Sequence, residues 1–282
     1  MGGLPLTSVW LTCQQPARDQ RRGRYVPETS SHPAKMLPAL AAHAITAYTR
    51  PGEMVLDPMC GSGTTLVEAV RSGRHSIGVD IEPRFTGLAR ANLRLAGEHH
   101  APGRGRVVTG DATDLPRLLP NRLRGQVALV VTSPPYGRRT HGLVKATAGH
   151  GVHKRDHRYG QRGGGNIAYA GWGGLIEGFA QIMAGCYAML RPGGLAVIAC
   201  RPVRRRPADL IDLPGQLLAA AMAVGYQPVE RCAALLAAVR DRQVIHRANM
   251  FGLLAVRRAR GNGIPAAVIA HEDVYVVQRP PA

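Results

Sequence analysis

The feature that most restricts the fold of this 282-residue chain is the apolar run 127–131, which leads directly into Ser133-Pro134-Pro135-Tyr136. Such a run predicts a buried strand of a parallel sheet, and the two prolines must end it. The carboxyl ends of parallel strands are where open α/β sheets bind ligands. Because proline has no N–H, this stretch offers mainly hydrogen-bond acceptors beside a flat ring, which suits a planar group with an exocyclic amine. The alternative is a strand end with a rigid turn.

A glycine loop stands in the same position on an earlier strand. The strand predicted at 54–56 is followed by Asp57-Pro58-Met59-Cys60-Gly61-Ser62-Gly63-Thr64-Thr65 and then by a helical pattern. Gly61 and Gly63 let the backbone approach a bound molecule closely. Leu66 occupies the place of the third glycine of a dinucleotide fingerprint, so that fingerprint is not met. Asp57 at the strand end favours a cationic ligand over a pyrophosphate.

Two further predicted strands also end in acidic residues. The strand 76–79 ends at Asp80, 23 residues after Asp57, and the strand 106–109 is followed by Asp111. A carboxylate after the second strand is placed to accept the hydroxyls of a ribose, and Asp111 could accept from an adenine amine. Each aspartate alone could be a helix N-cap. Three in phase, one per strand, favour a binding site at one edge of the sheet.

The charge of the chain indicates a polyanionic partner. Lys and Arg number 36 against 18 for Asp and Glu, which gives a net charge of +18 and a pI near 10.9. A field of this sign attracts nucleic acid, although a genome-wide bias toward Arg and Ala codons is the alternative. The aromatic content of 5% argues against a wide platform for stacking bases.

Cysteine spacing and hydropathy exclude several other classes. The five cysteines are odd in number and form no Cys-x-x-Cys pair, so neither a disulfide framework nor a zinc site is expected, and no metal is predicted. The first residues lack the basic and apolar regions of a signal peptide, and no apolar stretch is long enough for a membrane span. We therefore expect a cytoplasmic protein.

Taken together, these motifs resemble those of the S-adenosylmethionine-dependent amino-methyltransferases that modify N4 of cytosine or N6 of adenine in DNA. Residues 57–65 are similar to their cofactor loop, and Ser133-Pro134-Pro135-Tyr136 is similar to their catalytic tetrapeptide in the form associated with cytosine N4. His32-Pro33-Ala34-Lys35 resembles the motif that closes over the methionine end of the cofactor, and 271–277 resembles their final strand. The resemblance implies a class I, Rossmann-like α/β fold, with a mostly parallel seven-stranded sheet and helices on both faces.

The resemblance also implies the site residues. Ser133, Pro134, Pro135 and Tyr136 are expected to be catalytic. The residues expected to bind S-adenosylmethionine are His32, Lys35, Asp57, Cys60, Gly61, Gly63, Thr64, Thr65, Asp80, Ile81, Asp111 and Ala112. The cofactor loop precedes the tetrapeptide, an order shared with the enzymes that methylate a guanine amine in transfer RNA. DNA and RNA substrates therefore both stay open, and a nucleic-acid-binding protein without catalysis is the alternative of another class.

The basic segments outside the motifs complete the predicted organisation. Residues 1–31 are expected to form a basic N-terminal arm, and 32–282 a methyltransferase domain with a basic, flexible insertion at 138–174. An insertion of this length is either functional or unstructured. If functional, it would close on an extruded base and hold phosphates, through Arg138, Arg139, Lys154, Arg155, Arg158 and Arg162. A helix is expected to begin near His32, and closing strands around 229–239, 249–256 and 274–277.

Overall fold

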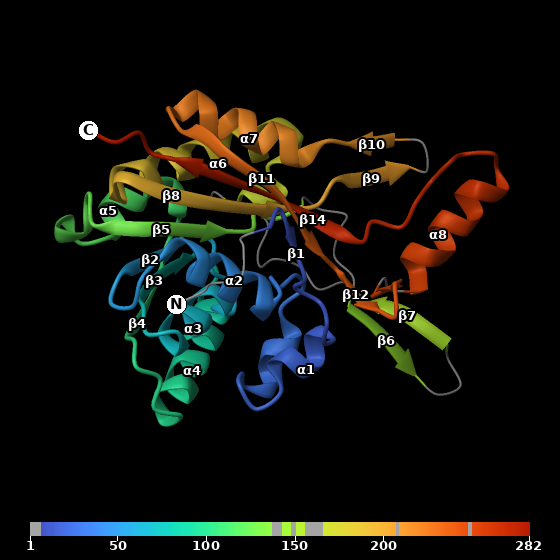
Figure 1. The fold of residues 1–282 in the computed structure, drawn as a ribbon, viewed down its shortest axis with the longest axis horizontal. Helices are drawn as coiled ribbons and strands as arrows, with labels where there is room; N and C mark the ends of the chain where they lie inside the picture. The colour runs from blue at the N-terminus through green and yellow to red at the C-terminus, as the bar shows by residue number, and fades with distance from the viewer. Residues whose placement is uncertain (1–6, 137–142, 148–150, 156–165, 207–208, 248–249) are drawn as a thin grey trace.

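The core of the computed structural model is a single eight-stranded sheet (Figure 1). The structure describes residues 7–136, 143–147, 151–155, 166–206, 209–247 and 250–282. The strand order is β1-β11-β14-β8-β5-β2-β3-β4. The strands are β1 (Val9–Trp10), β2 (Met54–Asp57), β3 (His75–Asp80), β4 (Gly105–Thr109), β5 (Val127–Thr132), β8 (Leu190–Cys200), β11 (Gln227–Leu235) and β14 (His271–Gln278).

Five neighbouring strands, β8, β5, β2, β3 and β4, run parallel, and only β14 is antiparallel to both of its neighbours. This arrangement confirms the predicted Rossmann-like α/β class. The sheet differs from the expected seven strands because the short edge strand β1 pairs in parallel with β11. The two residues of β1 lie in the segment 1–31, which was predicted to be an arm. A strand of two residues is too short to give a periodic pattern in the sequence.

Helices cover both faces of the sheet, as the buried residues of alternating strand positions require. On one face, Leu56, Val130 and Ile198 pack with residues of α6 (Gly171–Met189) and α7 (Leu213–Val224). On the other face, Val55, Leu129 and Val197 pack with α2 (Pro38–Tyr48). The helices α3 (Thr64–Arg71) and α4 (Pro83–Glu98) follow the glycine loop and β3, and pack on each other.

The N-terminal segment contacts the rest of the domain. Trp10 is buried in the cluster formed by α2 and its face of the sheet, and its ring lies 4.3 Å from that of His43. The segment continues through α1 (Ala17–Arg21) and a short 3-10 turn, Pro27–Ser31. A domain boundary at residue 32 stays a prediction. The contacts show that residues 9–31 contribute core side chains as well as basic ones.

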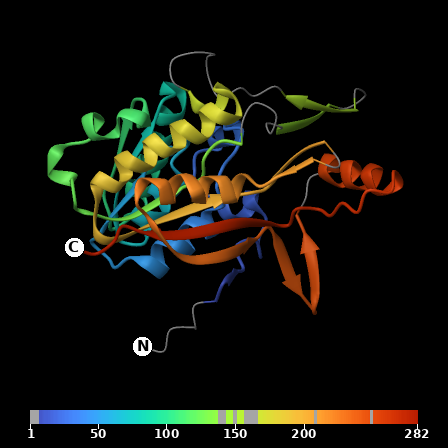
Figure 2. The same cartoon turned by 90° about the horizontal axis from the view of Figure 1, so that it is seen from above.

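Several small elements lie at the end of the molecule toward which β5 points (Figures 1 and 2). They are the pairs β6 (Leu143–Thr147) with β7 (Gly151–Arg155), β9 (Val203–Arg206) with β10 (Asp209–Ile211), and β12 (Ala237–Arg240) with β13 (Gln243–His246), together with α8 (Met250–Gly261). The predicted strand at 249–256 is therefore wrong. Its apolar run lies away from the main sheet, and Leu254 is exposed where a closing strand would bury it.

Two smaller differences concern helix length and hydropathy. The helix α2 begins at Pro38, six residues after the predicted start, and residues 32–37 before it form bends and irregular backbone. In the part of the chain that the structure describes, none of the helices combines the length and the apolar character of a membrane span.

Candidate functional site

One cavity follows the carboxyl edge of the parallel strands. Its volume is about 1050 Å³ with the open mouth included. Every residue predicted to be catalytic or to bind the cofactor lines this cavity, with the exception of Gly63. Predicted residues from five segments far apart in the sequence therefore meet at one place, because the carboxyl ends of β2, β3, β4 and β5 lie at the same edge.

Asp57 ends β2 and is buried, with 4% of its surface exposed. Its two carboxyl oxygens accept hydrogen bonds from the Met59 N–H at 3.1 Å and from the Thr65 hydroxyl at 2.6 Å. These bonds tie the loop to the start of α3. Burial outweighs both bonds and raises the pKa of Asp57 to about 7. The carboxyl group is thus a buried acid whose ionised form a bound cation would stabilise.

The two glycines of the loop have different roles. A side chain on Gly61 would lie 2.6 Å from Nε2 of His32, so only glycine allows the loop to approach that ring. Gly63 has a φ of 81° and packs against Ala89 of α4, where a Cβ would lie 2.9 Å from the alanine methyl. Gly63 therefore fits the helix start closely against α4, and this explains why it does not line the cavity. Asn92 of α4 holds the loop through the Ser62 carbonyl at 2.8 Å.

Asp80 and Asp111 extend the acidic edge over β3 and β4. Asp80 accepts from the Gly61 N–H at 2.8 Å and from the Glu82 N–H at 3.0 Å, and burial raises its pKa to about 6. Asp111 caps a short 3-10 turn by accepting from the N–H and the hydroxyl of Thr113. Asp111 therefore acts as a cap, which was the alternative interpretation, and it also lines the cavity, as predicted. The Cys60 N–H donates to the Val79 carbonyl at 2.9 Å, which ties the loop to β3.

His32 and Lys35 form another part of the cavity wall. His32 is 6% exposed, packs on Phe85 with ring centroids 4.2 Å apart, and has its pKa lowered to about 3 by burial. It is therefore a neutral ring at physiological pH. The Lys35 ammonium donates to the His32 carbonyl at 2.6 Å, and burial together with nearby Arg21 lowers its pKa to about 8.

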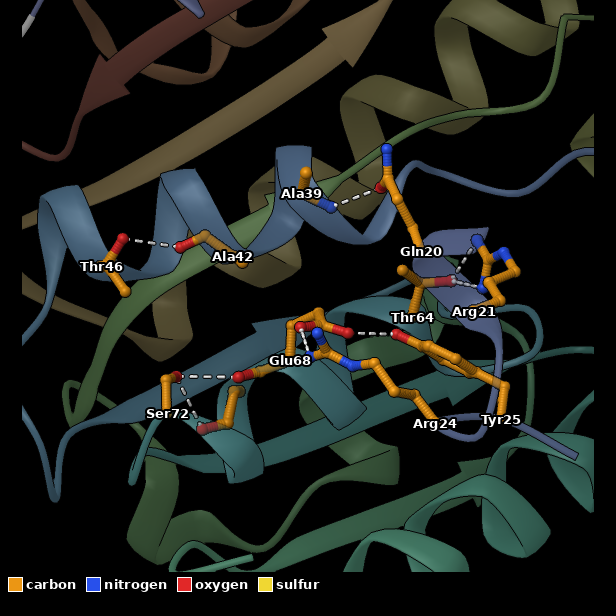
Figure 3. Close-up of polar contacts among 11 residues, drawn as sticks. Gln20, Arg21, Arg24, Tyr25, Ala39, Ala42, Thr46, Thr64, Glu68 and Ser72 are labelled. Carbon is orange, nitrogen blue, oxygen red and sulfur yellow. Dashed lines mark hydrogen bonds and ion pairs between the residues drawn. The ribbon is translucent and has the colours of Figure 1, made fainter. Parts of the chain in front are cut away.

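Arg21 connects the N-terminal segment to this wall, and sequence reasoning did not single it out as a site residue (Figure 3). Its guanidinium donates to the Met36 carbonyl at 2.5 Å and to the Thr64 hydroxyl at 3.2 Å. Next to it, Arg24 and Tyr25 both bond to the buried carboxylate of Glu68 on α3. Arg21 thereby joins two parts of the chain that line the cavity. One is the segment 32–37 before α2, through Met36, and the other is the start of α3, through Thr64.

The tetrapeptide after β5 occupies the other half of the cavity. Tyr136 is 8% exposed, and burial raises the pKa of its phenol well above the ordinary range. The Arg201 guanidinium lies over its ring, 5.3 Å from the centroid, and Arg201 Nε lies 3.5 Å from Oε1 of Glu272. Arg201 follows β8 and Glu272 lies on β14. Both line the cavity, and neither was among the predicted catalytic or cofactor-binding residues.

The residues predicted to contact nucleic acid are not placed by this structure. Arg138, Arg139, Arg158 and Arg162 lie outside the described residues, and for Lys154 and Arg155 only the backbone of β7 is described. Within the predicted insertion the backbone of β6 and β7 forms an antiparallel pair, and α6 begins at Gly171. Asn166, Ile167 and Ala168, from the end of the insertion, line the cavity, although no motif marks them in the sequence.

The residues present fit S-adenosylmethionine, the cofactor that the resemblance implies. Its sulfonium and amine are cationic, and the buried acid Asp57 lines the cavity, where it can balance such a charge. The half-buried Asp80, at the end of the next strand, lines the same cavity and suits the hydroxyls of the ribose. The His32 ring packs against the backbone at Gly61, and both residues line the cavity, so glycine lets the loop and this ring form one continuous part of its wall. The cavity is also of the size that holds small-molecule ligands.

The fold and the edge site define the class of S-adenosylmethionine-dependent methyltransferases. The structure of TrmN from Thermus thermophilus is 20% identical, with a TM-score of 0.54, and the match covers 92% of this chain and 53% of that one. A methyltransferase from Methanosarcina mazei, described as S-adenosylmethionine-dependent, is 11% identical with a TM-score of 0.50, over 84% and 97% of the two chains. At these identities the likeness concerns the fold.

Sequence comparison points to a family within that class. Residues 2–90 match the model of a family described as DNA methylase. A tRNA (guanine(10)-N2)-dimethyltransferase of Methanothermobacter thermautotrophicus is 36% identical over 38% of this chain and 29% of its own length. DNA adenine methyltransferase YhdJ of Escherichia coli is 37% identical over 29% of each chain. Type II methyltransferase M2.DpnII of Streptococcus pneumoniae is 42% identical over 24% of this chain and 25% of its own.

These matches confirm the resemblance to nucleic-acid amino-methyltransferases that the motifs predict. The matched segments span between a quarter and a third of the length of these curated relatives.

Proposed function

We propose that the chain transfers a methyl group from S-adenosylmethionine to an exocyclic amine of a nucleobase, with N4 of cytosine or N6 of adenine in DNA as the acceptor. The observation that carries the proposal is the single cavity that joins the glycine loop of residues 57–65 to Ser133-Pro134-Pro135-Tyr136. When bound, S-adenosylmethionine supplies a methyl group on a positively charged sulfur.

The chain contributes mainly position and charge. Asp57, Asp80 and Asp111 hold the cationic and hydrogen-bond-donating parts of the donor over β2, β3 and β4. Asp57 is ionised most readily when a cation lies beside it, so donor binding and its ionisation favour each other. Aligned reactants can gain roughly 7–11 kcal/mol over a random encounter.

The tetrapeptide prepares the amine. An exocyclic amine is a weak nucleophile because its lone pair is delocalised into the ring. The Ser133 hydroxyl and the Pro134 carbonyl are placed to accept its two hydrogens, which favours a pyramidal nitrogen with its lone pair directed at the methyl group. The bound donor would supply the methyl carbon to this nitrogen with loss of its carbon–sulfur bond, and the amine would release a proton to solvent. Tyr136 stacks on the base, which must leave the duplex to enter the cavity.

Basic side chains beyond the cavity suit a nucleic-acid substrate. Arg240 and Arg242 in the β12–β13 hairpin and Arg257, Arg258 and Arg260 on α8 are exposed. These elements lie at the end of the molecule toward which β5 points (Figure 1). Among the side chains of β12, β13 and α8 that the structure describes, acidic groups are limited to the turn residue Asp241. Such a surface attracts phosphates without reading sequence.

The second candidate function is methylation of a guanine amine in transfer RNA. It is favoured by the match to the guanine dimethyltransferase of M. thermautotrophicus, which spans 107 residues. The two candidates differ in the acceptor base, so identification of the methylated nucleoside separates them.

The test is a radiolabelled methyl-transfer assay on fragmented genomic DNA and on unfractionated tRNA, with product nucleosides identified by mass spectrometry. The double variant Ser133→Ala with Tyr136→Ala should lose transfer and keep donor binding measured by calorimetry. The control is Glu98→Gln, at the exposed end of α4 and outside the cavity lining. Unchanged turnover in the double variant, or absence of donor binding by the wild-type chain, contradicts the proposal.

A further inference from the structure

The strand order divides the cavity into two halves. Asp57, Asp80 and Asp111 stand over β2, β3 and β4, while the tetrapeptide follows β5. Beyond β5 the order continues with β8 and β14, whose ends carry Arg201 and Glu272. If the donor lies over the three aspartates, the acceptor base lies against Tyr136, and the next side chains along the edge are those of Arg201 and Glu272.

Glu272 is a buried acid with a free oxygen in this second half. It is 5% exposed and lines the cavity. Its Oε1 faces Arg201, whereas Oε2 has no hydrogen-bond partner among the residues that the structure describes. Asp273, the next residue on β14, points to the other face and is paired with Arg231 at 3.0 Å. A buried polar atom without a partner is destabilising, so it indicates a partner supplied by a ligand.

The chemistry of the base edge identifies the atom that such a group would contact. On the Watson–Crick edge of cytosine and adenine, the ring nitrogen beside the exocyclic amine has a lone pair and no hydrogen, whereas the guanine ring nitrogen on that edge, N1, carries a hydrogen. The tetrapeptide presents acceptors to the amine, so a cytosine or adenine in the cavity also needs a donor for that ring nitrogen. A carboxylic acid supplies this donor, and a carboxylate would repel the ring nitrogen.

We propose that Glu272, in its protonated form, donates a hydrogen bond to the ring nitrogen next to the amine and thereby selects cytosine or adenine over guanine. This inference rests on the proposed function and names a specificity-determining residue for it. Arg201 faces Oε1 of the carboxyl group, so Oε2 is the oxygen that is left for a ligand.

The surroundings shift Glu272 toward its protonated form. Burial raises the pKa of Glu272, while nearby Arg201 and His271 act in the opposite direction, and the net direction is upward. The titratable groups around it come from several elements: His271 on β14, Cys200 and Arg201 at the end of β8, Tyr136 after β5, and Cys13 after β1. A base that closes the cavity excludes more water and favours the neutral acid further.

The experiment measures methylated nucleosides across pH 6 to 9 with the full chain, fragmented genomic DNA and unfractionated tRNA. Since the acid form is the donor, transfer to cytosine or adenine by the wild-type chain should fall as the pH rises through the pKa of Glu272. Glu272→Gln keeps a donor at every pH, so its rate should stay within about threefold of wild type at low pH and lose the alkaline fall. Glu272→Ala should lower transfer about 10- to 100-fold with unchanged affinity for S-adenosylmethionine.

The matched control is Asp273→Asn, which makes the same chemical change one residue along on the opposite face and should keep the wild-type pH profile. The inference is overturned by a wild-type rate in Glu272→Ala, by an unchanged alkaline fall in Glu272→Gln, or by N2-methylguanine as the main product. Absence of any methylated base in the wild-type reaction, with donor binding intact, instead refutes the proposed function, and this inference with it.

Discussion

Replacement of Asp57 by asparagine should stabilise the free protein at neutral pH while it weakens binding of the donor. Asp57 is buried at the end of β2, and its pKa rises from an ordinary 3.8 to about 7. When the pKa of a carboxyl group is higher in the native state than in the unfolded state, the native state holds an extra proton at pH values between the two pKa values. The contribution of Asp57 to the free energy of unfolding is therefore greatest below about pH 4, and it is lost as the pH rises to 7.

The magnitude follows from the size of the shift. A difference of about three pKa units corresponds to a loss of about 4 kcal/mol between pH 4 and pH 8. Asparagine does not ionise and avoids this loss. Its amide replaces one of the two oxygens that accept from Thr65 and Met59, which costs about 1–2 kcal/mol at every pH. Asp57→Asn should thus be slightly less stable than wild type at pH 4 and about 2–3 kcal/mol more stable at pH 8.

The assay is urea unfolding at several pH values between 4 and 8, with calorimetric binding of S-adenosylmethionine alongside it. Wild-type affinity for the donor should increase from pH 6 to pH 8 as Asp57 ionises, and the variant should bind weakly at both. Asp241→Asn, in the exposed turn between β12 and β13, is the control for the chemical change itself. A constant difference in unfolding free energy between variant and wild type from pH 4 to 8 refutes the reasoning.

Two further predictions concern the contacts that hold the donor half of the site. Arg21→Ala removes the hydrogen bonds to the Met36 carbonyl and the Thr64 hydroxyl, so it should raise the dissociation constant of S-adenosylmethionine about tenfold. The side chain of Arg22 is exposed, and Arg22→Ala should leave this constant unchanged. Equal affinities of the two variants in calorimetry contradict the role of Arg21. Asn92→Ala leaves the Ser62 carbonyl and the Val26 N–H without their buried hydrogen-bond partner, so it should lower the free energy of unfolding by about 2–4 kcal/mol. A change below about 1 kcal/mol in urea unfolding argues against this role of Asn92.

The secondary structure around the motifs was predictable because its signals are local. An apolar run ended by Asp57, Asp80 or the Ser133 tetrapeptide marks both a buried strand and its carboxyl end. Parallel strands bring those ends to one edge, so a shared cavity followed from the order of the motifs alone. The same reasoning was wrong for 249–256, where an apolar stretch forms α8, since a short run does not separate strand from helix.

The side chains that line the acceptor half of the cavity depend on the pairing of strands that are distant in the sequence. Glu272 reaches the site only because β14 inserts between β8 and β11, and Arg201 only because β8 pairs with β5. Arg21 acts through contacts with Thr64, 43 residues away in the chain. The sequence alone therefore determined which residues end the strands. The tertiary structure decided which side chains from other segments meet them, because that depends on strand order and helix packing rather than on local pattern.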